Sequence, residues 1–373
     1  MRRRFCLSPL PALLSRAALL LLLVVVLSAC GDGQQSEPEP LTVYSGRSQP
    51  LVDGLVERFE EQADFEVQVR YGTDAQLLST IQEEGGQSPA DLFWANTAGA
   101  LAEAQQADLF TTLPDSLMTR AAAFRPKSGR WSPVTTRFRT LAYHTDAVDT
   151  TALPSSVMAL PQLAEDFEGR IGWTPTYSSF QDFITAMRAI HGEDTTSTWL
   201  TEMQELNPKS YSSNTPMIQA LADGEIDVAL TNHYYVLRLK HGGAEGEYEE
   251  EEHDEGEEHE EEDEESANPN APVAMHRFAP GNTGNLALVT GAGVMQQSAQ
   301  QQRAQQFLQF LLSPEAQQFA AQQVNEYPVT EGVQVPPYMM PVDEALTLGP
   351  EVDFQELQDL DETLALMRET GLL

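Results

Sequence analysis

The alternation of short apolar runs with longer amphipathic segments constrains the fold of this chain more than any other feature of its sequence. From Leu41 onward, runs of strand length are followed by segments in which apolar residues recur at a helical period, as at Leu51, Leu55 and Phe59. The pattern predicts strands at 41–44, 65–70 and 90–94, with helices after Leu51, after Leu77 and at 98–106. A βαβαβ order of this kind is typical of a sheet covered by helices on both faces.

The remainder of the chain repeats this order. It predicts strands at 138–143, 171–174, 226–230 and 286–290, and helices at 178–191, 196–206, near Thr215, at 303–311 and at 314–323. Two α/β units of about 100 to 150 residues fit the usual size of a domain, and strands that return late imply that the chain crosses between two lobes more than once. We expect the first lobe at 41–121 with 286–336, and the second at 122–285 with 337–373.

Residues 1–30 are predicted to be an export signal and not part of the fold. Arginines at positions 2–4 precede the apolar run Ala17–Leu27, and small residues follow it. The sequence Leu-Ser-Ala-Cys that ends at Cys30 resembles the bacterial lipoprotein processing site, which predicts lipidation of Cys30. A single membrane-spanning anchor is the alternative, although the run is shorter than the ~20 residues that a span needs. Residues 31–40 would form a polar tether, and both interpretations place the protein outside the cytoplasm.

Charge and cysteine content exclude several classes of protein. The chain has 57 acidic and 21 basic residues, a formal net charge of −36, so it repels phosphate backbones and we expect no binding of nucleic acid. Its two cysteines, Cys6 and Cys30, are too few for a disulfide framework or a thiolate metal cluster.

One segment departs from the α/β pattern. Residues 241–270 contain 16 acidic residues, with His253 and His259 among them and no lysine or arginine. Because the segment has almost no apolar residues to bury, it is predicted to be disordered. Two interpretations stay open for it: a loose collector of divalent metal ions, or a solvated insert without a ligand.

The sharpest chemical signal is a pair of adjacent tyrosines, Tyr234 and Tyr235, which closely follow the predicted buried strand 226–230. Ligands of open α/β sheets bind beyond the carboxyl ends of the strands. At a turn from strand to helix, both phenols can converge on one site, and a hard trivalent cation can take up phenolate oxygens despite an ordinary tyrosine pKa near 10. The alternative is a pair of tyrosines that only pack.

Seven segments, in this order and spacing, resemble one known family, the bacterial periplasmic ferric-ion-binding proteins, which are the solute receptors of iron(III) ABC transporters. The resemblance covers nearly all of residues 41–340 apart from the acidic segment. It rests on VYSG at 43–46, SPADLF at 88–93, GRIGWTPT at 169–176, Asn214, DGEIDVAL at 223–230, NHYY at 232–235 and EYP at 326–328.

The resemblance implies a two-lobed periplasmic-binding-protein fold of type II, with central mixed sheets flanked by helices and lobes joined by crossing hinge strands. It implies that the lobes close on one ferric ion. Tyr234 and Tyr235 match the two tyrosinate ligands of the family, and phosphate or carbonate would complete the metal shell. The matching anion donors are Ser178, Ser179, Asn214 and Asn232, and Arg139 matches a charge-compensating arginine. A helix start with free amides suits an anion, although Ser178 and Ser179 could equally be an ordinary N-cap.

Three positions depart from the family pattern. Ser48 stands where many members have a histidine, and Asn96 stands where they have a glutamate, so the first lobe is expected to line the cleft and contribute little direct coordination. Tyr177 stands where several members have a small residue that contacts the anion. It would supply a third phenolate, narrow the anion pocket, or lie over the rim of the cleft.

The sequence therefore predicts a receptor, not an enzyme, which captures ferric iron outside the cytoplasm, acts as a monomer and delivers the ion to an ABC permease. An alternative with the same fold is a receptor for an oxyanion or for a chelated metal, zinc included. A secreted metalloenzyme is a third class, but the chain lacks zinc-ligand pairs at helical spacing and a nucleophile elbow.

Overall fold

A computed structural model describes residues 39–121, 124–163, 167–243, 267–357 and 359–373. The chain divides into two compact units, 1–39 and 40–373, and the second contains the fold described below. The predicted signal 1–30 with Cys30, most of the tether 31–40 and most of the acidic segment 241–270 lie outside the described residues. Among the described residues, no helix has the length and apolarity that a membrane span requires.

The described strands form one mixed sheet of ten strands, in the order β2-β1-β3-β9-β4-β7-β5-β6, with β8 and β10 also paired to β4. Parallel pairs join β1 to β2 and β3, and β5 to β6 and β7, whereas β4 and β9 run antiparallel to their neighbours. The strands are β1 Leu41–Ser45, β2 Val67–Tyr71, β3 Leu92–Ala95, β4 Ser132–His144, β5 Ile171–Trp173, β6 Lys209–Ser210, β7 Val228–Asn232, β8 Val273–His276, β9 Ala287–Val294 and β10 Tyr327–Pro328.

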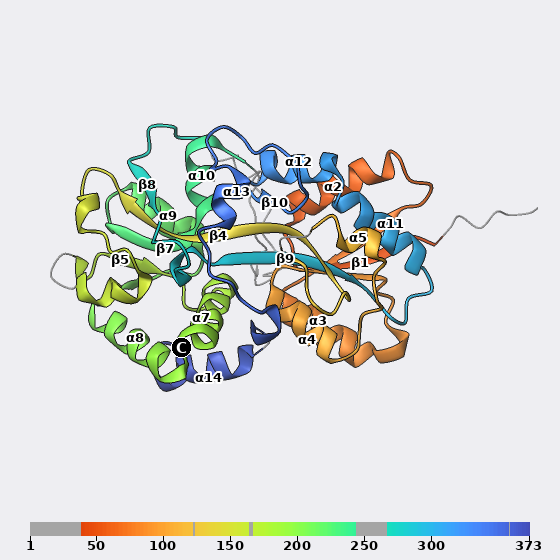
Figure 1. Cartoon of the computed structure of the whole chain (residues 1–373), viewed down its shortest axis with the longest axis horizontal. Coiled ribbons are helices and arrows are strands. Elements are labelled where there is room, and N and C mark those ends of the chain that lie inside the picture. Colours follow the sequence, from red (N-terminus) through yellow and green to blue (C-terminus); the bar gives the residue numbers. More distant parts are fainter. Residues whose placement is uncertain (1–38, 122–123, 164–166, 244–266, 358) are drawn as a thin grey trace, which may run out of the picture. The chain divides into compact units, whose positions relative to one another are not determined.

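Strand β4 joins the two halves of the sheet. Its first half pairs with β9, ending with Phe138 opposite Ala287. Its second half pairs with β7, beginning with Arg139 opposite Asn232, and with β8. In Figure 1, β4 and β9 run side by side across the middle of this unit, between α7–α10 and α2–α4. The predicted crossing of the chain between two halves is therefore made by strands β4 and β9.

Helices cover the sheet, and several begin at the polar residues that favour helix starts. Thr73 forms a capping box with Gln76 at the start of α3, and Ser313 accepts a hydrogen bond from Ala316 at the start of α12. The longer helices are α2 Gln49–Glu60, α3 Asp74–Glu84, α4 Ala98–Gln106, α7 Ser178–His191, α8 Glu193–Glu205, α9 Asn214–Ala222, α10 His233–His241, α11 Gln301–Leu311, α12 Pro314–Gln323 and α14 Leu360–Glu369.

Short helices complete the described fold. They are α5 Asp115–Met118, α13 Val342–Leu346 and the 3₁₀ turns Gly85–Gln87, Thr150–Ala152, Val157–Leu163, Thr283–Asn285 and Phe354–Leu357, the last of which is η6.

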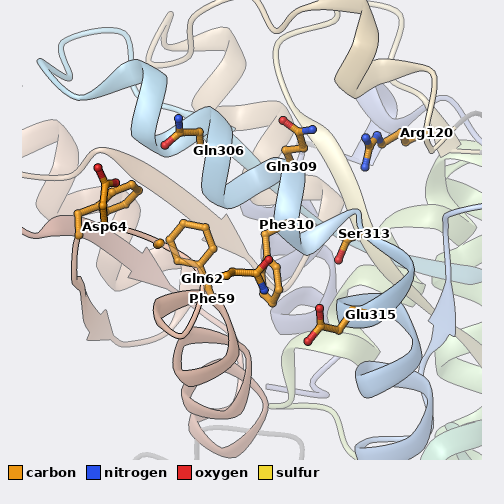
Figure 2. Close-up of a pocket in the computed structure, with 11 residues that line it drawn as sticks. Phe59, Gln62, Asp64, Arg120, Gln306, Gln309, Phe310, Ser313 and Glu315 are labelled. Atoms are coloured by element: carbon orange, nitrogen blue, oxygen red, sulfur yellow. The ribbon is translucent and has the colours of Figure 1, made fainter.

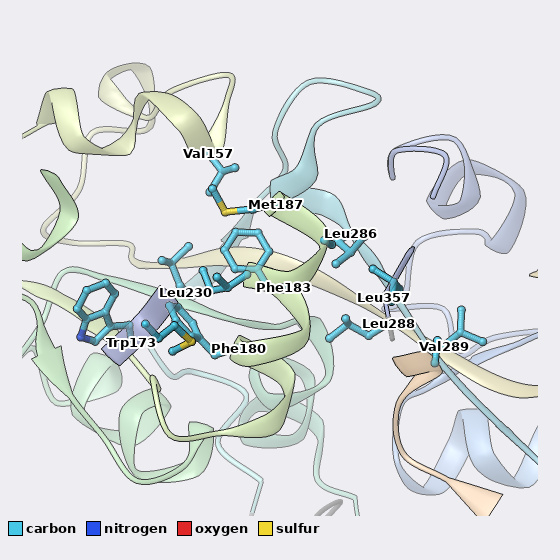
Figure 3. Close-up of a cluster of buried hydrophobic side chains, with 14 of the residues drawn as sticks. Val157, Trp173, Phe180, Phe183, Met187, Leu230, Leu286, Leu288, Val289 and Leu357 are labelled. Carbon is cyan, nitrogen blue, oxygen red and sulfur yellow. The ribbon is translucent and has the colours of Figure 1, made fainter. Parts of the chain in front are cut away.

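The largest buried cluster extends from α7 to the crossing strands. Phe180, Phe183 and Met187 on α7 pack with Trp173 of β5 and with apolar residues of β7 and β9 (Figure 3). The ring of Phe183 meets those of Phe180 and Trp199 edge-on, at centroid distances of 6.1 Å. This packing fixes the first turn of α7, on which predicted site residues lie.

The α/β fold class predicted from the sequence is confirmed, and helices α4, α7 and α12 have the predicted bounds. The strand predicted at 138–143 is longer, because β4 begins at Ser132 and its residues 132–142 are all buried. Its first half is rich in threonine and arginine, so apolar patterning does not reveal it. The bounds of helix α10 were not predicted, since the helix begins inside the tyrosine motif, where the sequence analysis placed only a turn from strand to helix.

We expect Gly291→Ala to destabilise the crossing strands. A Cβ on Gly291 would lie 2.7 Å from the backbone oxygen of Ser132 on β4, which cannot move without separating the two strands. The expected loss is about 1–3 kcal/mol in the free energy of unfolding, measured by chemical denaturation. Gly86→Ala is the matched control, because a Cβ there meets no heavy atom within 4 Å. Equal stabilities of the two variants would contradict the close approach.

Candidate functional site

Tyr234 and Tyr235 lie in the first turn of α10, directly beyond the end of β7 at Asn232. Both side chains are buried, and their rings stack with centroids 4.2 Å apart and an interplanar angle of 30°. On a strand, adjacent residues point to opposite faces. Because these two stand at a helix start, their rings can lie together.

His233 fixes the start of α10. Its Nδ1 accepts a hydrogen bond from the backbone N–H of Phe138 on β4 at 3.1 Å, so its Nε2 carries the proton and donates to the backbone oxygen of Asn325 at 2.9 Å. Burial lowers the pKa of His233 to about 3, which keeps the imidazole neutral. Because His233 directly precedes the tyrosine pair, its two hydrogen bonds hold the pair next to β4 and next to Asn325.

Tyr177 reaches the tyrosine pair from another element. It is the N-cap residue of α7, and its hydroxyl lies 3.2 Å from the hydroxyl of Tyr235. The guanidinium of Arg238 lies over the Tyr235 ring, 5.2 Å from its centroid. The structure thus brings the three tyrosines of the sequence prediction into one cluster.

Three helix N-termini adjoin this cluster, those of α7, α9 and α10. None of their N-cap side chains accepts a capping hydrogen bond. Each terminus carries a buried polar atom with no partner among the described residues: Ser179 Oγ, Asn214 Nδ2 and Asn232 Nδ2. Unpaired buried donors cost free energy, which a ligand with acceptor atoms would recover, and helix N-termini favour an anion.

The amide orientations follow from neighbouring hydrogen bonds. Thr231 Oγ1 donates to Asn214 Oδ1 at 3.1 Å, and Arg139 donates to Asn232 Oδ1 at 3.2 Å. Both amide oxygens are therefore occupied, which leaves the NH₂ groups as the unsatisfied atoms. Arg139 itself is buried, donates to the Leu230 backbone oxygen at 3.1 Å and lies over the Phe183 ring.

Ser178, the remaining predicted anion donor, is exposed at the first position of α7. Its neighbour Ser179 is fully buried. Of the two adjacent serines, Ser179 is thus the one whose hydroxyl is shielded from water and has no partner in the part of the chain that the structure describes.

On the side of β1 and β3, the two departures from the family pattern have different surroundings. Ser48 is buried at the N-cap of α2, and its Oγ has no partner among the described residues. Asn96 is half-buried, and its Oδ1 accepts hydrogen bonds from Arg47 and, at 2.8 Å, from Arg137. With its oxygen engaged by two cations, Asn96 is poorly placed to bind a metal ion.

Arg47, Arg137 and Glu326 form a buried ion cluster beside Ser48 and Asn96, and this cluster was not predicted from the sequence. Arg47 donates to Glu326 Oε1 at 2.6 Å, and Arg137 lies 3.6 Å from the same oxygen. Burial acts to raise the pKa of Glu326, but the charges of Arg47 and Arg137 and a hydrogen bond from Thr135 hold it below its ordinary value. Three weak signals in the sequence could have found it: Arg47 in a predicted turn, Arg137 in what proves to be strand β4, and Glu326 in the EYP motif.

The charges of this cluster act on the tyrosine pair. Burial raises the pKa of Tyr234 to about 12, while the positive charges of Arg137, Arg238 and Arg47 lower it and the carboxylate of Glu326 raises it. Tyr234 therefore keeps its proton at neutral pH when no cation binds it. A bound cation would have to displace that proton.

Among the described residues, no group of three or more His, Cys, Asp or Glu side chains is placed to hold a metal ion. A pocket of about 520 Å³ beside α2 and α11 has an apolar wall, Phe59, Phe65 and Phe310, and a polar rim that includes Gln306 and Gln309 (Figure 2). None of the unpartnered buried polar atoms lines this pocket.

The model of the family of bacterial extracellular solute-binding proteins matches residues 54–343 of the chain. The chain belongs to this family. It is 26% identical over 347 residues to the Fe(3+)-binding periplasmic protein of Serratia marcescens, covering 92% of this chain and 94% of the relative. It is 30% identical over 309 residues to iron uptake protein A2 of Synechocystis, covering 82% of each chain.

Solved structures show the same architecture. Iron-bound HitA from Pseudomonas aeruginosa is 29% identical, with a TM-score of 0.76, covering 90% of this chain and all of that one. Apo FutA2 from Synechocystis is 26% identical, with a TM-score of 0.69, covering 91% of this chain and 100% of that one. The resemblance to periplasmic ferric-binding proteins and the two-lobed fold of type II are confirmed, and so is the class of solute-binding transport protein rather than enzyme.

We expect His233 to make the stability of this solute-binding protein sensitive to mild acid. Below pH 6.5 the unfolded chain protonates this histidine, whereas the folded protein does not until about pH 3, so its stabilising contribution is lost as the pH falls through that window. Between pH 7 and 5 the loss is about 2 kcal/mol. The variant His233→Gln lacks the imidazole, so this pH-dependent contribution to the free energy of unfolding is absent from it.

The measurement is the difference in the free energy of unfolding between the wild-type protein and His233→Gln, which should shrink by that amount from pH 7 to pH 5. Asp182, whose pKa burial raises to about 7, titrates with the opposite sign but is present in both proteins and cancels. Parallel stability curves would contradict a neutral buried His233.

Proposed function

We propose that this protein captures ferric iron outside the cytoplasm through the phenol oxygens of Tyr234, Tyr235 and Tyr177, together with a bound anion, and delivers the ion to an ABC permease. Its family and its relatives support capture for transport, since those relatives are named as iron-binding and iron-uptake proteins. The observation that carries the proposal is the cluster of three tyrosines beside three buried donors that have no partner in the described part of the chain.

Phenolate oxygens suit a ferric ion because both are hard. A trivalent cation stabilises the phenolate strongly enough to overcome the raised pKa of Tyr234. Tyr177 Oη is close enough to Tyr235 Oη for both to ligate one ion, so we assign it the third phenolate. The site then releases protons as it binds iron, and binding should strengthen with rising pH.

The anion completes the shell. Ser179, Asn214 and Asn232 offer donors that no acceptor among the described residues uses. Ser178 stands beside them, and Arg139 orients Asn232. Phosphate and carbonate each have several acceptor oxygens and a negative charge that three helix N-termini favour. We assign these residues to the anion.

Capture would use a hinge. We assign residues 41–121 with 286–336 to the first lobe and 122–285 with 337–373 to the second, joined by β4 and β9. An ion ligated in the cleft would favour the closed form over the open one. We further propose that residues 1–30 direct export, that a lipid on Cys30 anchors the protein through the tether 31–40, and that it acts as a monomer.

A second candidate function is the capture of an oxyanion or a chelated metal, zinc included, by the same site. The specific observation that favours it is the first-lobe side of the site, where Asn96 binds two arginines and offers no free ligand oxygen. The two candidate functions predict complexes of different colour. An iron-tyrosinate complex absorbs visible light through charge transfer, and an oxyanion complex does not.

Ferric titration of the apo protein tests the first candidate. We expect an orange-red colour that saturates at one ion per chain, and its loss in the double variant Tyr234→Phe/Tyr235→Phe. Loss of even outer partners of a metal site costs roughly 10- to 100-fold in affinity, so loss of two ligands should cost more than about 100-fold. Tyr71→Phe is the control, since Tyr71 lies on β2 and its hydroxyl donates a hydrogen bond to Asp53, which is not part of the candidate site. A double variant with full colour and affinity would refute the assignment.

Ser179→Ala tests the anion site. A hydrogen bond to a charged group contributes about 1.5–3 kcal/mol, so the variant should weaken the effect of phosphate or carbonate on iron affinity by roughly 10- to 100-fold. Because its hydroxyl has no partner among the described residues, the folding stability of the variant should be unchanged or higher. The exposed Ser116→Ala serves as the control, and an unaltered anion dependence in Ser179→Ala would count against the site.

A further inference from the structure

The carboxylate of Asp182 on α7 is buried without a hydrogen-bond or ion-pair partner in the described part of the chain. The residue is 9% exposed, and no described residue bonds its carboxylate. Folded proteins pair most buried charges and hydrogen-bond most buried polar groups, and the candidate site does not use this group. Resting on the two lobes of the proposed function, we infer that Asp182 is a proton-linked latch between them: it is uncharged in the closed form, so that closure takes up one proton.

Asp182 lies where helices of the two lobes meet. A Cβ on Gly99 of α4 would lie 3.8 Å from Asp182 Oδ1 and 2.7 Å from the backbone oxygen of Leu357 in η6. Helix α4 belongs to the first lobe and α7 to the second. Turn η6 contacts both helices, and in Figure 1 the dark-blue segment that carries it lies between them. The missing side chain of Gly99 therefore permits a close approach between the lobes.

This contact lies on the cleft side of the hinge strands β4 and β9. Gly99 follows Asn96 by three residues, and Asp182 follows Ser179 by three residues, so each stands just behind a residue of the candidate site. Hinge closure brings such surfaces together, and opening separates them. In the open form α7 moves away from α4, and Asp182 regains water.

Asp74 of α3 already caps the start of α4. Its carboxylate accepts hydrogen bonds from the backbone N–H groups of Asn96 and Thr97, each at 2.9 Å, and from the Thr97 hydroxyl at 2.8 Å. Because α3 and α4 both belong to the first lobe, these bonds persist when the lobes part. Asp182 therefore approaches a helix start that another carboxylate occupies.

The other surroundings of Asp182 compensate its charge poorly. Among the described cations, Arg137 of β4 acts on it. Helix α4 and turn η6 face it with Gly99 and Leu357, which carry no charge. Burial raises the pKa of Asp182 to about 7, while Arg137 acts to lower it and Asp74 to raise it further.

The sign of the effect follows from proton linkage. An aspartate in water has a pKa near 3.9, so the closed form binds the proton of Asp182 more tightly than the open form. The contribution of Asp182 to closure is fully present below about pH 4 and is lost as the pH rises through about 7. Between pH 5 and pH 8 the equilibrium constant for closure should fall by up to roughly 80-fold. Because the tyrosines lose iron affinity as the pH falls, Asp182 offsets part of that loss in mild acid.

The variant Asp182→Asn, which keeps the shape of the side chain without its charge, tests the latch in the full chain. Ferric iron is supplied from a competing chelator, and the affinity of each protein is read by absorbance from pH 5 to pH 8. Protonation of the tyrosines and of the chelator affects both proteins alike and cancels in the ratio. The affinity of the variant relative to wild type should grow with pH, by up to roughly 80-fold over this range.

Small-angle X-ray scattering of the iron-free protein reports the separation of the lobes. We expect the radius of gyration of wild type to fall as the pH is lowered from 8 to 5, and that of Asp182→Asn to stay at the lower value throughout. Asp194→Asn, which removes an exposed carboxylate in the first turn of α8, is the matched control and should behave as wild type. Asp182→Ala is a second uncharged variant, which keeps the test valid if the first one folds poorly.

An affinity ratio and a radius of gyration that are both independent of pH would overturn the latch. So would a pH dependence confined to the free energy of unfolding, because Asp182 would then be buried equally in the open and closed forms. Either readout supports the latch if it changes with pH in wild type and not in the uncharged variants. Failure of the proposed function looks different, since wild type would then form no visible band with iron at any pH, and the scattering of the iron-free protein would decide the inference alone.

Discussion

The structure depends on the change of partner along strand β4. Its residues pair with β9 up to Phe138 and with β7 from Arg139 onward. At this exchange, Arg137 and Arg139 stand on either side of Phe138 and reach Asn96 and Asn232 respectively. A single strand therefore sets both walls of the candidate site, because its pairing fixes where each guanidinium lies.

A second constraint is the burial of polar groups before any ligand is present. Folded proteins satisfy most buried donors internally. Within the described ranges, however, Ser48, Ser179, Asn214 and Asn232 each keep a polar atom without a partner. The amide oxygens of Asn214 and Asn232 are held by Thr231 and Arg139, which orients the two NH₂ groups as donors. Such a site is incomplete when empty, and its unmet hydrogen bonds favour occupation by an acceptor-rich ligand.

Electrostatics link the two walls. Tyr234 is buried with a raised pKa and stays neutral, while Arg47 and Arg137 exceed the charge of their shared partner Glu326. The candidate site therefore brings neutral phenols within electrostatic reach of buried guanidiniums.

The α/β order, helices α4, α7 and α12, and the tyrosine motif at a strand-to-helix junction were all predictable from the sequence, because each depends on local periodicity and spacing. The resemblance to ferric-binding proteins also came from short segments in order. The anion donors stay a prediction, and nothing local in the sequence shows that Ser179, and not Ser178, is buried with a hydroxyl that has no partner among the described residues.

The early start of β4, the hydrogen bonds of His233 and the Arg47–Glu326–Arg137 cluster were decided by tertiary structure alone. Arg47 and Glu326 lie 279 positions apart, and a strand of threonines and arginines has no apolar period to reveal it. Local sequence determines which segments are helices or strands, because propensity and periodicity act over a few residues. Which buried charges meet, and which donors stay unsatisfied, depends on how distant strands pair, and that is settled only when the whole sheet forms.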